Sequence, residues 1–153
     1  MIDQKDLKNI RELIEDFFQK AGFEIFLEGI TLKENTLMIN LKTNESKMLI
    51  GERGEILSDV QHLLKAILKR KIQKEFYIDL DINDYKKRKI KYLKEIAKSL
   101  ADEVSLTRKE KILPPMPSYE RRIIHLELAA RKDIITQSTG KEPERRMVIK
   151  PYP

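Results

Sequence analysis

Two glycines separated by two residues stand about a third of the way along the chain. The run Gly51-Glu52-Arg53-Gly54 comes directly before a long helical pattern. Glycine lets a backbone approach a ligand closely, and the start of a helix offers free N–H groups and a positive dipole end. This combination is suited to holding phosphates. Arg53 adds a cation, whereas the carboxylate of Glu52 repels phosphate by about 1 kcal/mol at roughly 4 Å in water.

A second set of basic residues lies in the other half of the chain. Arg121 and His125 are four residues apart in a helical pattern, so they are expected to share one helix face. Arginine can hold a phosphate through two hydrogen bonds, and a neutral histidine can donate one hydrogen bond or stack on a base. Further candidate contacts are Lys86, Lys87, Arg122 and Arg145. The arginines among them are equally able to pair with the glutamates at 120, 142 and 144.

The charge is unevenly distributed along the sequence. The chain has 153 residues and a formal net charge of +6, from 31 Lys+Arg and 25 Asp+Glu. Residues 1–83 contain 13 basic and 15 acidic residues, whereas residues 84–153 contain 18 and 10, so the two parts carry −2 and +8. The four consecutive cations at 86–89 oppose the dipole of a predicted helix, which favours a functional role. A basic half indicates an anionic partner such as nucleic acid, although a solvated helix face has the same composition.

Other chemistries lack their residues. The absence of cysteine excludes disulfides, redox thiols and Cys-ligated zinc, and no nucleophile elbow, P-loop or His-Glu-x-x-His motif is present. Asp79 and Asp81 fall on one face of a predicted strand and are the remaining metal candidates, but such a pair more commonly marks the wet side of a sheet. We therefore predict no catalytic residue, no metal and no cofactor.

Hydrophobic periodicity predicts a small α/β unit in the first half. Its elements in order are a helix over 3–21, strands over 23–28 and 37–42, a short helix over 48–50, a long helix after Gly54 and a strand over 76–82. A turn at 33–35 joins the first two strands. The buried stripe of the long helix is predicted at Ile56, Val60, Leu63, Ile67 and Leu68.

The second half predicts helices on a small sheet. Asn83-Asp84 offers a cap for a helix to about residue 104, and three prolines prevent a further helix until Ser118. The helix over 118–130 is predicted to bury Tyr119, Ile123, Leu126 and Ala130. Strands over 134–137 and 145–149 close the chain. The fold class is therefore α+β, with two small domains at 1–82 and 83–153.

The order of these elements and motifs resembles known families. The first half, with Gly-x-x-Gly between two helices after a hairpin, resembles a K-homology (KH) domain of the type with its extra helix and strand at the N-terminus. The run Pro-Pro-Met-Pro-Ser-Tyr-Glu-Arg-Arg-Ile-Ile-His followed by Glu-Pro-Glu-Arg-Arg-Met-Val-Ile resembles the Arg-x-x-x-His domain, which is named for an Arg and a His separated by three residues. Together they resemble the SpoIIIJ-associated (Jag) family of bacterial RNA-binding proteins. Members often carry a further N-terminal domain, which we expect this chain to lack.

The resemblance implies both a fold and a function. It implies a type II-like KH domain (αββααβ) whose loop clamps the backbone of about four nucleotides, and it places Arg121 and His125 at the nucleic-acid surface. The expected protein is cytoplasmic and non-catalytic, binds single-stranded RNA or DNA, and acts as a post-transcriptional regulator. No apolar run of about 18 residues predicts a transmembrane helix, and the polar N-terminus is unlike a signal peptide.

Two alternatives stay open. Glu52 weakens the case for phosphate binding, which favours a protein-interaction adaptor. For such an adaptor, the resemblance implies a small KH-only partner protein and links to cell-envelope growth and division, cell shape, cell-wall biogenesis and chaperone function. The second alternative is a metal-dependent nuclease that uses Asp79 and Asp81.

Overall fold

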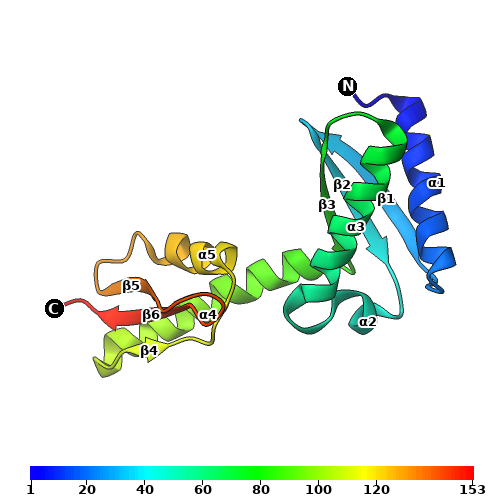
Figure 1. The fold of residues 1–153 in the computed structure, drawn as a ribbon. Helices are drawn as coiled ribbons and strands as arrows, with labels where there is room; N and C mark the ends of the chain where they lie inside the picture. The colour runs from blue at the N-terminus through cyan, green and yellow to red at the C-terminus, as the bar shows by residue number, and fades with distance from the viewer. The chain divides into compact units, whose positions relative to one another are not determined.

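The computed structural model describes residues 1–153 and has the predicted α+β fold class. The chain forms two compact units, Met1–Lys86 and Lys87–Pro153 (Figure 1). The first unit carries 14 basic and 16 acidic residues and the second carries 17 and 9, so their net charges are −2 and +8. No helix combines the length and the apolar character needed to cross a membrane.

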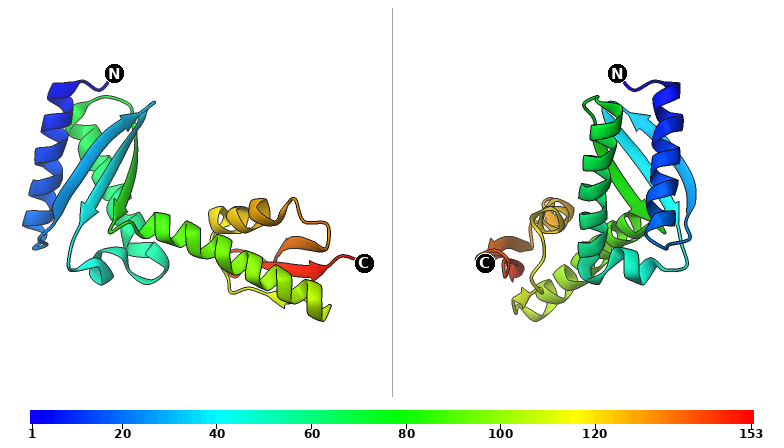
Figure 2. Two further views of the ribbon diagram at one scale, coloured as in Figure 1. Left: turned by 180° about the vertical axis from the view of Figure 1, so that it is seen from behind. Right: turned by 45° about the vertical axis from the view of Figure 1, so that its right-hand side comes forward.

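The first unit is a three-stranded sheet with helices on one face. Its elements are α1 (Gln4–Lys20), β1 (Phe26–Lys33), β2 (Thr36–Lys42), α2 (Ser46–Ile50), the single 3₁₀ turn η1 (Glu52–Gly54), α3 (Glu55–Ile72) and β3 (Tyr77–Ile82). The strand order is β1-β2-β3, with β1 antiparallel and β3 parallel to β2. Helices α1 and α3 pack side by side on this sheet (Figure 2). The element order is the αββααβ order predicted from the sequence.

Two predictions in the first unit were wrong in detail. The strand expected at 23–28 begins at Phe26, because the N–H of Phe23 donates to the carbonyl of Phe18 at 2.9 Å and this segment completes the end of α1. The buried stripe of α3 consists of Leu57, Leu64 and Leu68. Ile56 and Leu63, which were expected inside, are 41% and 51% exposed. Adjacent apolar residues along this helix offer two stripes, and packing on the sheet selects the later one.

The second unit combines two helices with a three-stranded antiparallel sheet. Its elements are α4 (Tyr85–Thr107), whose first two residues belong to the first unit, β4 (Lys111–Ile112), α5 (Ser118–Leu128), β5 (Ile134–Thr139) and β6 (Arg146–Pro151). The strand order is β4-β6-β5. The short strand β4 was not predicted. The core joins one side of the sheet to apolar residues of both helices, among them Leu93, Ala97, Ile124, Leu128, Met147 and Ile149.

The predicted inner face of α5 was also wrong. Tyr119 and Leu126 are 54% and 61% exposed, whereas Ile124 and Leu128 are buried. Apolar residues surround most of this helix, so their spacing is compatible with more than one inner face. The face observed also buries Glu120 and Arg121.

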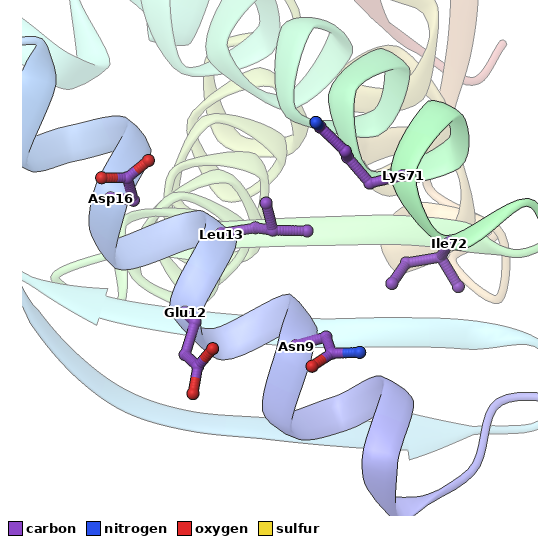
Figure 3. Close-up of a pocket in the computed structure, with 6 residues that line it drawn as sticks. All are labelled: Asn9, Glu12, Leu13, Asp16, Lys71 and Ile72. Carbon is purple, nitrogen blue, oxygen red and sulfur yellow. The ribbon is translucent and has the colours of Figure 1, made fainter.

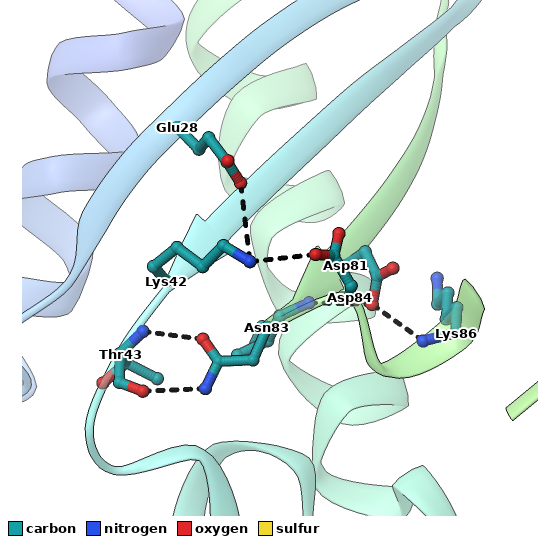
Figure 4. A network of polar contacts seen from close by, with 8 residues as sticks. Glu28, Lys42, Thr43, Asp81, Asn83, Asp84 and Lys86 are labelled. Carbon is teal, nitrogen blue, oxygen red and sulfur yellow. Dashed lines mark hydrogen bonds and ion pairs between the residues drawn. The ribbon is translucent and has the colours of Figure 1, made fainter. Parts of the chain in front are cut away.

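The cap of α4 comes from a different residue than predicted. Asn83 and Asp84 both have positive φ angles, of 53° and 56°. The carboxylate of Asp81 accepts the N–H of Lys86 at 3.0 Å and that of Ile82 at 2.9 Å. Asp81 therefore satisfies a free donor of the first helical turn from the end of β3 (Figure 4).

Candidate nucleic-acid interface

The Gly-x-x-Gly loop has a backbone that only its glycines can adopt without strain. Gly51 has φ 72° and ψ −179°, and a Cβ at this position would lie 2.6 Å from Cγ1 of Ile56. Gly54 has φ 77°, and its Cβ would meet the Tyr85 ring at 3.0 Å. Arg53 has φ 55°, which is uncommon for a residue with a side chain. The two glycines therefore allow the close turn that leads into α3.

The start of α3 presents unbonded backbone donors beside this loop. The helix begins at Glu55, and no side chain caps its first N–H groups. Free N–H groups at a helix start attract anions, because they coincide with the positive end of the helix dipole. Met48 and Ile56 lie beside the loop and are 61% and 41% exposed. The loop thus combines phosphate donors with an apolar surface on which bases can lie.

The charges of the loop oppose each other. Glu52 and Arg53 are both exposed, and neither forms an ion pair. Since the two side chains have opposite charge, the backbone donors contribute more attraction for phosphate than the side chains do.

Lys86, a predicted phosphate contact, is engaged within the first unit. Its Nζ lies 2.5 Å from the carboxylate of Asp79 and 2.8 Å from the side-chain oxygen of Gln61. Figure 4 shows Lys86 beside a network at the end of β3 in which the side chain of Asn83 bonds both backbone groups of Thr43. Lys86 is therefore a neutralised structural cation. Lys87, the next residue, is exposed.

Asp79 and Asp81 do not form a metal site. Asp79 pairs with Lys86, and Asp81 accepts backbone N–H groups. No three His, Asp or Glu side chains of the chain gather closely enough to hold a metal ion.

A hollow of about 490 Å³ lies between α1 and α3 (Figure 3). Its polar lining includes the carboxylates of Glu12 and Asp16, with Lys71 as the cation. The two carboxylates give this hollow an acidic character that repels phosphate. It is therefore not a second part of the nucleic-acid site.

The expectation that Arg121 lies open at a surface was wrong. Its side chain is only 9% exposed, and Nη2 lies 2.6 Å from the carboxylate of Glu142. Nη1 donates to the carbonyl of Met116 at 2.6 Å. These bonds join the proline-rich segment to the loop between β5 and β6. Arg121 therefore positions two loops and is not available to grip a phosphate.

His125 lies at the surface, as predicted. Its Nδ1 is 2.7 Å from the hydroxyl of Thr136 on β5. This contact fixes the ring between α5 and the sheet and leaves Nε2 without a partner. Although Arg121 and His125 are four residues apart, the first points into the unit and the second lies on its flank.

Two further predicted cations of the second unit remain uncancelled by carboxylates. Arg122 is exposed and forms no ion pair. Arg145 donates to the Ser138 hydroxyl at 2.8 Å and to the carbonyl of Gly140 at 2.7 Å. Because these acceptors are neutral, the guanidinium keeps its full positive charge while its position is fixed. Arg146, by contrast, lies 3.8 Å from the carboxylate of Glu144.

The geometry of the second unit agrees with its sequence family. Residues 91–151 match the Arg-x-x-x-His domain family. This match covers both residues for which the domain is named, Arg121 and His125, and the whole antiparallel sheet.

Curated relatives extend the similarity into the first unit. A Clostridium symbiosum protein named RNA-binding protein KhpB is 35% identical over 116 residues, which are 76% of this chain and 52% of the relative. A protein of the same name from Bacillus subtilis is 33% identical over 124 residues, 78% of this chain and 60% of the relative. The one from Lactiplantibacillus plantarum is 36% identical over 111 residues, 72% and 34% of the two chains. The chain therefore spans about a third to three fifths of the length of these relatives.

The Arg-x-x-x-His domain also contains surface residues that the sequence patterns did not single out. Tyr152 and Lys132 line a hollow next to His125. Tyr152 stands between two prolines in a segment without periodicity, and Lys132 is one of many lysines, so neither position carries a recognisable signal. Their grouping depends on how the C-terminal end of β6 passes the end of α5.

Proposed function

We propose that this chain is a non-catalytic protein that binds single-stranded RNA through both of its units. In this proposal residues 1–82 form a type II KH domain and residues 83–153 form the second binding domain. The αββααβ order, the parallel pairing of β2 with β3 and the Gly-x-x-Gly loop between α2 and α3 support the first assignment. The names of the relatives support RNA as the ligand.

The single observation that carries the proposal is the glycine loop before the uncapped start of α3. Backbone N–H groups of this segment bind successive phosphates, and Gly51 and Gly54 let the strand approach the backbone closely. Arg53 adds one charge contact. Bases that leave the stack rest on the exposed side chains of Met48 and Ile56.

The second unit supplies most of the electrostatic attraction. Its net charge of +8 draws the RNA, and the uncancelled guanidinium groups of Arg122 and Arg145 contact phosphates. His125 Nε2 bonds a base or a sugar. Two weak sites on one strand raise the overall affinity through effective concentration when the RNA spans both.

A titration of labelled RNA tests this function. Fluorescence anisotropy is measured with single-stranded RNA, duplex RNA and single-stranded DNA over a series of salt concentrations. We expect preference for the single strand and an affinity that falls with salt, with a slope of about 0.7 per phosphate contacted. The double variant Arg53→Gln/Arg122→Gln should bind weakly with a shallower slope. Absence of binding at low salt, or a double variant equal to the parent protein, would falsify the proposal.

A second candidate function is a protein-interaction adaptor. It is favoured by the exposed carboxylate of Glu52 within the loop and by the −2 charge of the first unit. Its partner would be a small KH-only protein, in a cytoplasmic complex linked to cell-envelope growth, cell shape and cell-wall biogenesis. Co-purification from nuclease-treated lysate separates the two functions, because only a protein-mediated complex survives RNA removal.

A further inference from the structure

A hollow of about 540 Å³ lies between the end of α5 and β5 in the second unit. Ligand pockets in proteins have volumes of about 300–1,000 Å³, so the space is large enough for one nucleotide. Leu128, Ile134 and Ile135 give it an apolar side, and His125 and Thr136 give it a polar side. Tyr152 and Lys132 complete the lining.

The backbone of Tyr152 is held while its ring stays uncovered. Its N–H donates to the carbonyl of Asp133 at 3.0 Å, and its own carbonyl accepts from Nη2 of Arg108 at 2.5 Å. The residue is nevertheless 55% exposed, and its ring makes no hydrogen bond or ring contact. An aromatic ring fixed in this way loses little conformational entropy when a flat ligand stacks on it.

The hollow has one uncancelled cation. Arg131 also lines it, but its guanidinium is bound by the carboxylates of Asp133 and Asp102, each at 2.5 Å. Lys132 is exposed and forms no ion pair. An anionic group of a ligand will therefore be drawn to Lys132, whereas Arg131 acts as a rigid wall.

His125 supplies a hydrogen-bonding group at the same place. Because Nδ1 is engaged by the Thr136 hydroxyl at 2.7 Å, the unbonded ring nitrogen is Nε2. The ring orientation is fixed by this contact, so a partner in the hollow meets a hydrogen-bonding group of defined direction.

We propose that this hollow binds one unstacked nucleotide of a single-stranded RNA, with the base stacked on Tyr152. In this arrangement His125 Nε2 bonds the edge of the base or its ribose, and Lys132 contacts the phosphate. An acidic peptide would use the cation but would leave the aromatic ring and the apolar side unfilled. This inference rests on the proposed RNA-binding function and assigns it a defined base subsite.

Three tyrosine variants of the full chain test the inference with labelled single-stranded RNA. Tyr152→Leu keeps apolar bulk but removes the aromatic face, and stacking on an aromatic side chain accounts for about a five- to hundredfold gain in affinity per base. We expect a loss of that size for Tyr152→Leu and none for Tyr152→Phe. Tyr119→Leu is the matched control, because Tyr119 is 54% exposed on the outer face of α5 and does not line the hollow.

A spectroscopic measurement separates this inference from the function beneath it. Adenosine 5′-monophosphate should shift the backbone amide signals of Thr136 and Tyr152 in the NMR spectrum of the parent protein, and not in that of Tyr152→Leu. If the parent binds RNA and Tyr152→Leu binds equally well, the subsite is overturned while RNA binding stands. If the parent binds no RNA, both fail. A polyglutamate peptide that shifts the same amides more strongly than the nucleotide would overturn the assignment to a nucleotide.

Discussion

The guanidinium of Arg121 is bound by the carboxylate of Glu142, with Nη2 2.6 Å from Oε1. Its other amino group donates to the carbonyl of Met116. The arginine for which the Arg-x-x-x-His domain is named thus connects the proline-rich segment to the loop before β6. RNA contacts in this unit fall instead to exposed neighbours such as Arg122 and His125.

We predict that Arg121→Met destabilises the second unit more than it weakens RNA binding. The substitution leaves the Met116 carbonyl without its donor, and an unpaired group of this kind costs about 1–3 kcal/mol. Urea denaturation followed by NMR signals of the second unit measures the loss. The salt dependence of RNA binding by the folded protein should not change, because no phosphate contact is removed.

Arg122→Gln provides the control from the adjacent position. Its side chain is exposed and unpaired, so stability should change by less than about 0.5 kcal/mol. RNA affinity should fall, and the salt slope should decrease by about 0.7 for one lost phosphate contact. Loss of a phosphate contact in Arg121→Met with no loss of stability would contradict these roles.

Glu52→Gln should strengthen RNA binding. Removing a carboxylate about 4 Å from a phosphate relieves about 1 kcal/mol of repulsion in water, which corresponds to about fivefold in affinity. Anisotropy titration at low salt measures the change, which should shrink as salt rises. Glu34→Gln is the matched control, since Glu34 is also exposed but lies at the turn between β1 and β2. Equal gains in both variants would indicate a general charge effect and not a loop contact.

The order of elements was predictable because their periodicity is local. The alternation that ends in Ile82 and the helical spacing through Ile10 and Ile14 each identify an element without information from elsewhere in the chain. Helix faces were less predictable. In α5 the apolar residues surround most of the helix, and only tertiary packing selects Ile124 and Leu128 for the core.

The candidate site was predictable for its glycine loop and less so for its charges. Gly51 and Gly54 carry their conformational role in their residue type. The environment of Arg121 depends on Glu142, which is 21 residues away, and that of Lys86 depends on Asp79 and Gln61. A list of cations cannot show which are cancelled, because their partners are defined by the fold.

Gly51→Ala should destabilise the first unit more than alanine at other glycines. The added Cβ would lie 2.6 Å from Ile56 Cγ1, and the backbone at φ 72° is strained for alanine, which costs about 1–3 kcal/mol. Gly22→Ala keeps only the strain, because its φ is 85° and nothing lies within 4 Å of the added atom. Gly29→Ala meets neither problem. Urea denaturation should therefore rank the losses Gly51, Gly22, Gly29, and a different order would contradict the geometry of the loop.

Acid should destabilise the second unit through Asp133. Hydrogen bonds from Arg131 and then from Ser105 hold the pKa of Asp133 well below its usual range. Because folding lowers this pKa, the stabilisation is present above the unfolded-state pKa near 3.8 and is lost as pH falls through the folded-state value. Asp133→Asn should therefore lower stability at neutral pH and reduce its fall in acid. Hydrogen exchange at the Tyr152 amide, which donates to the Asp133 carbonyl, reports the second unit. Asp59→Asn, at an exposed and unpaired carboxylate of the first unit, should leave that exchange unchanged. If Asp133→Asn is as acid-sensitive as the parent protein, the clamp between Arg131 and Asp133 does not stabilise this unit.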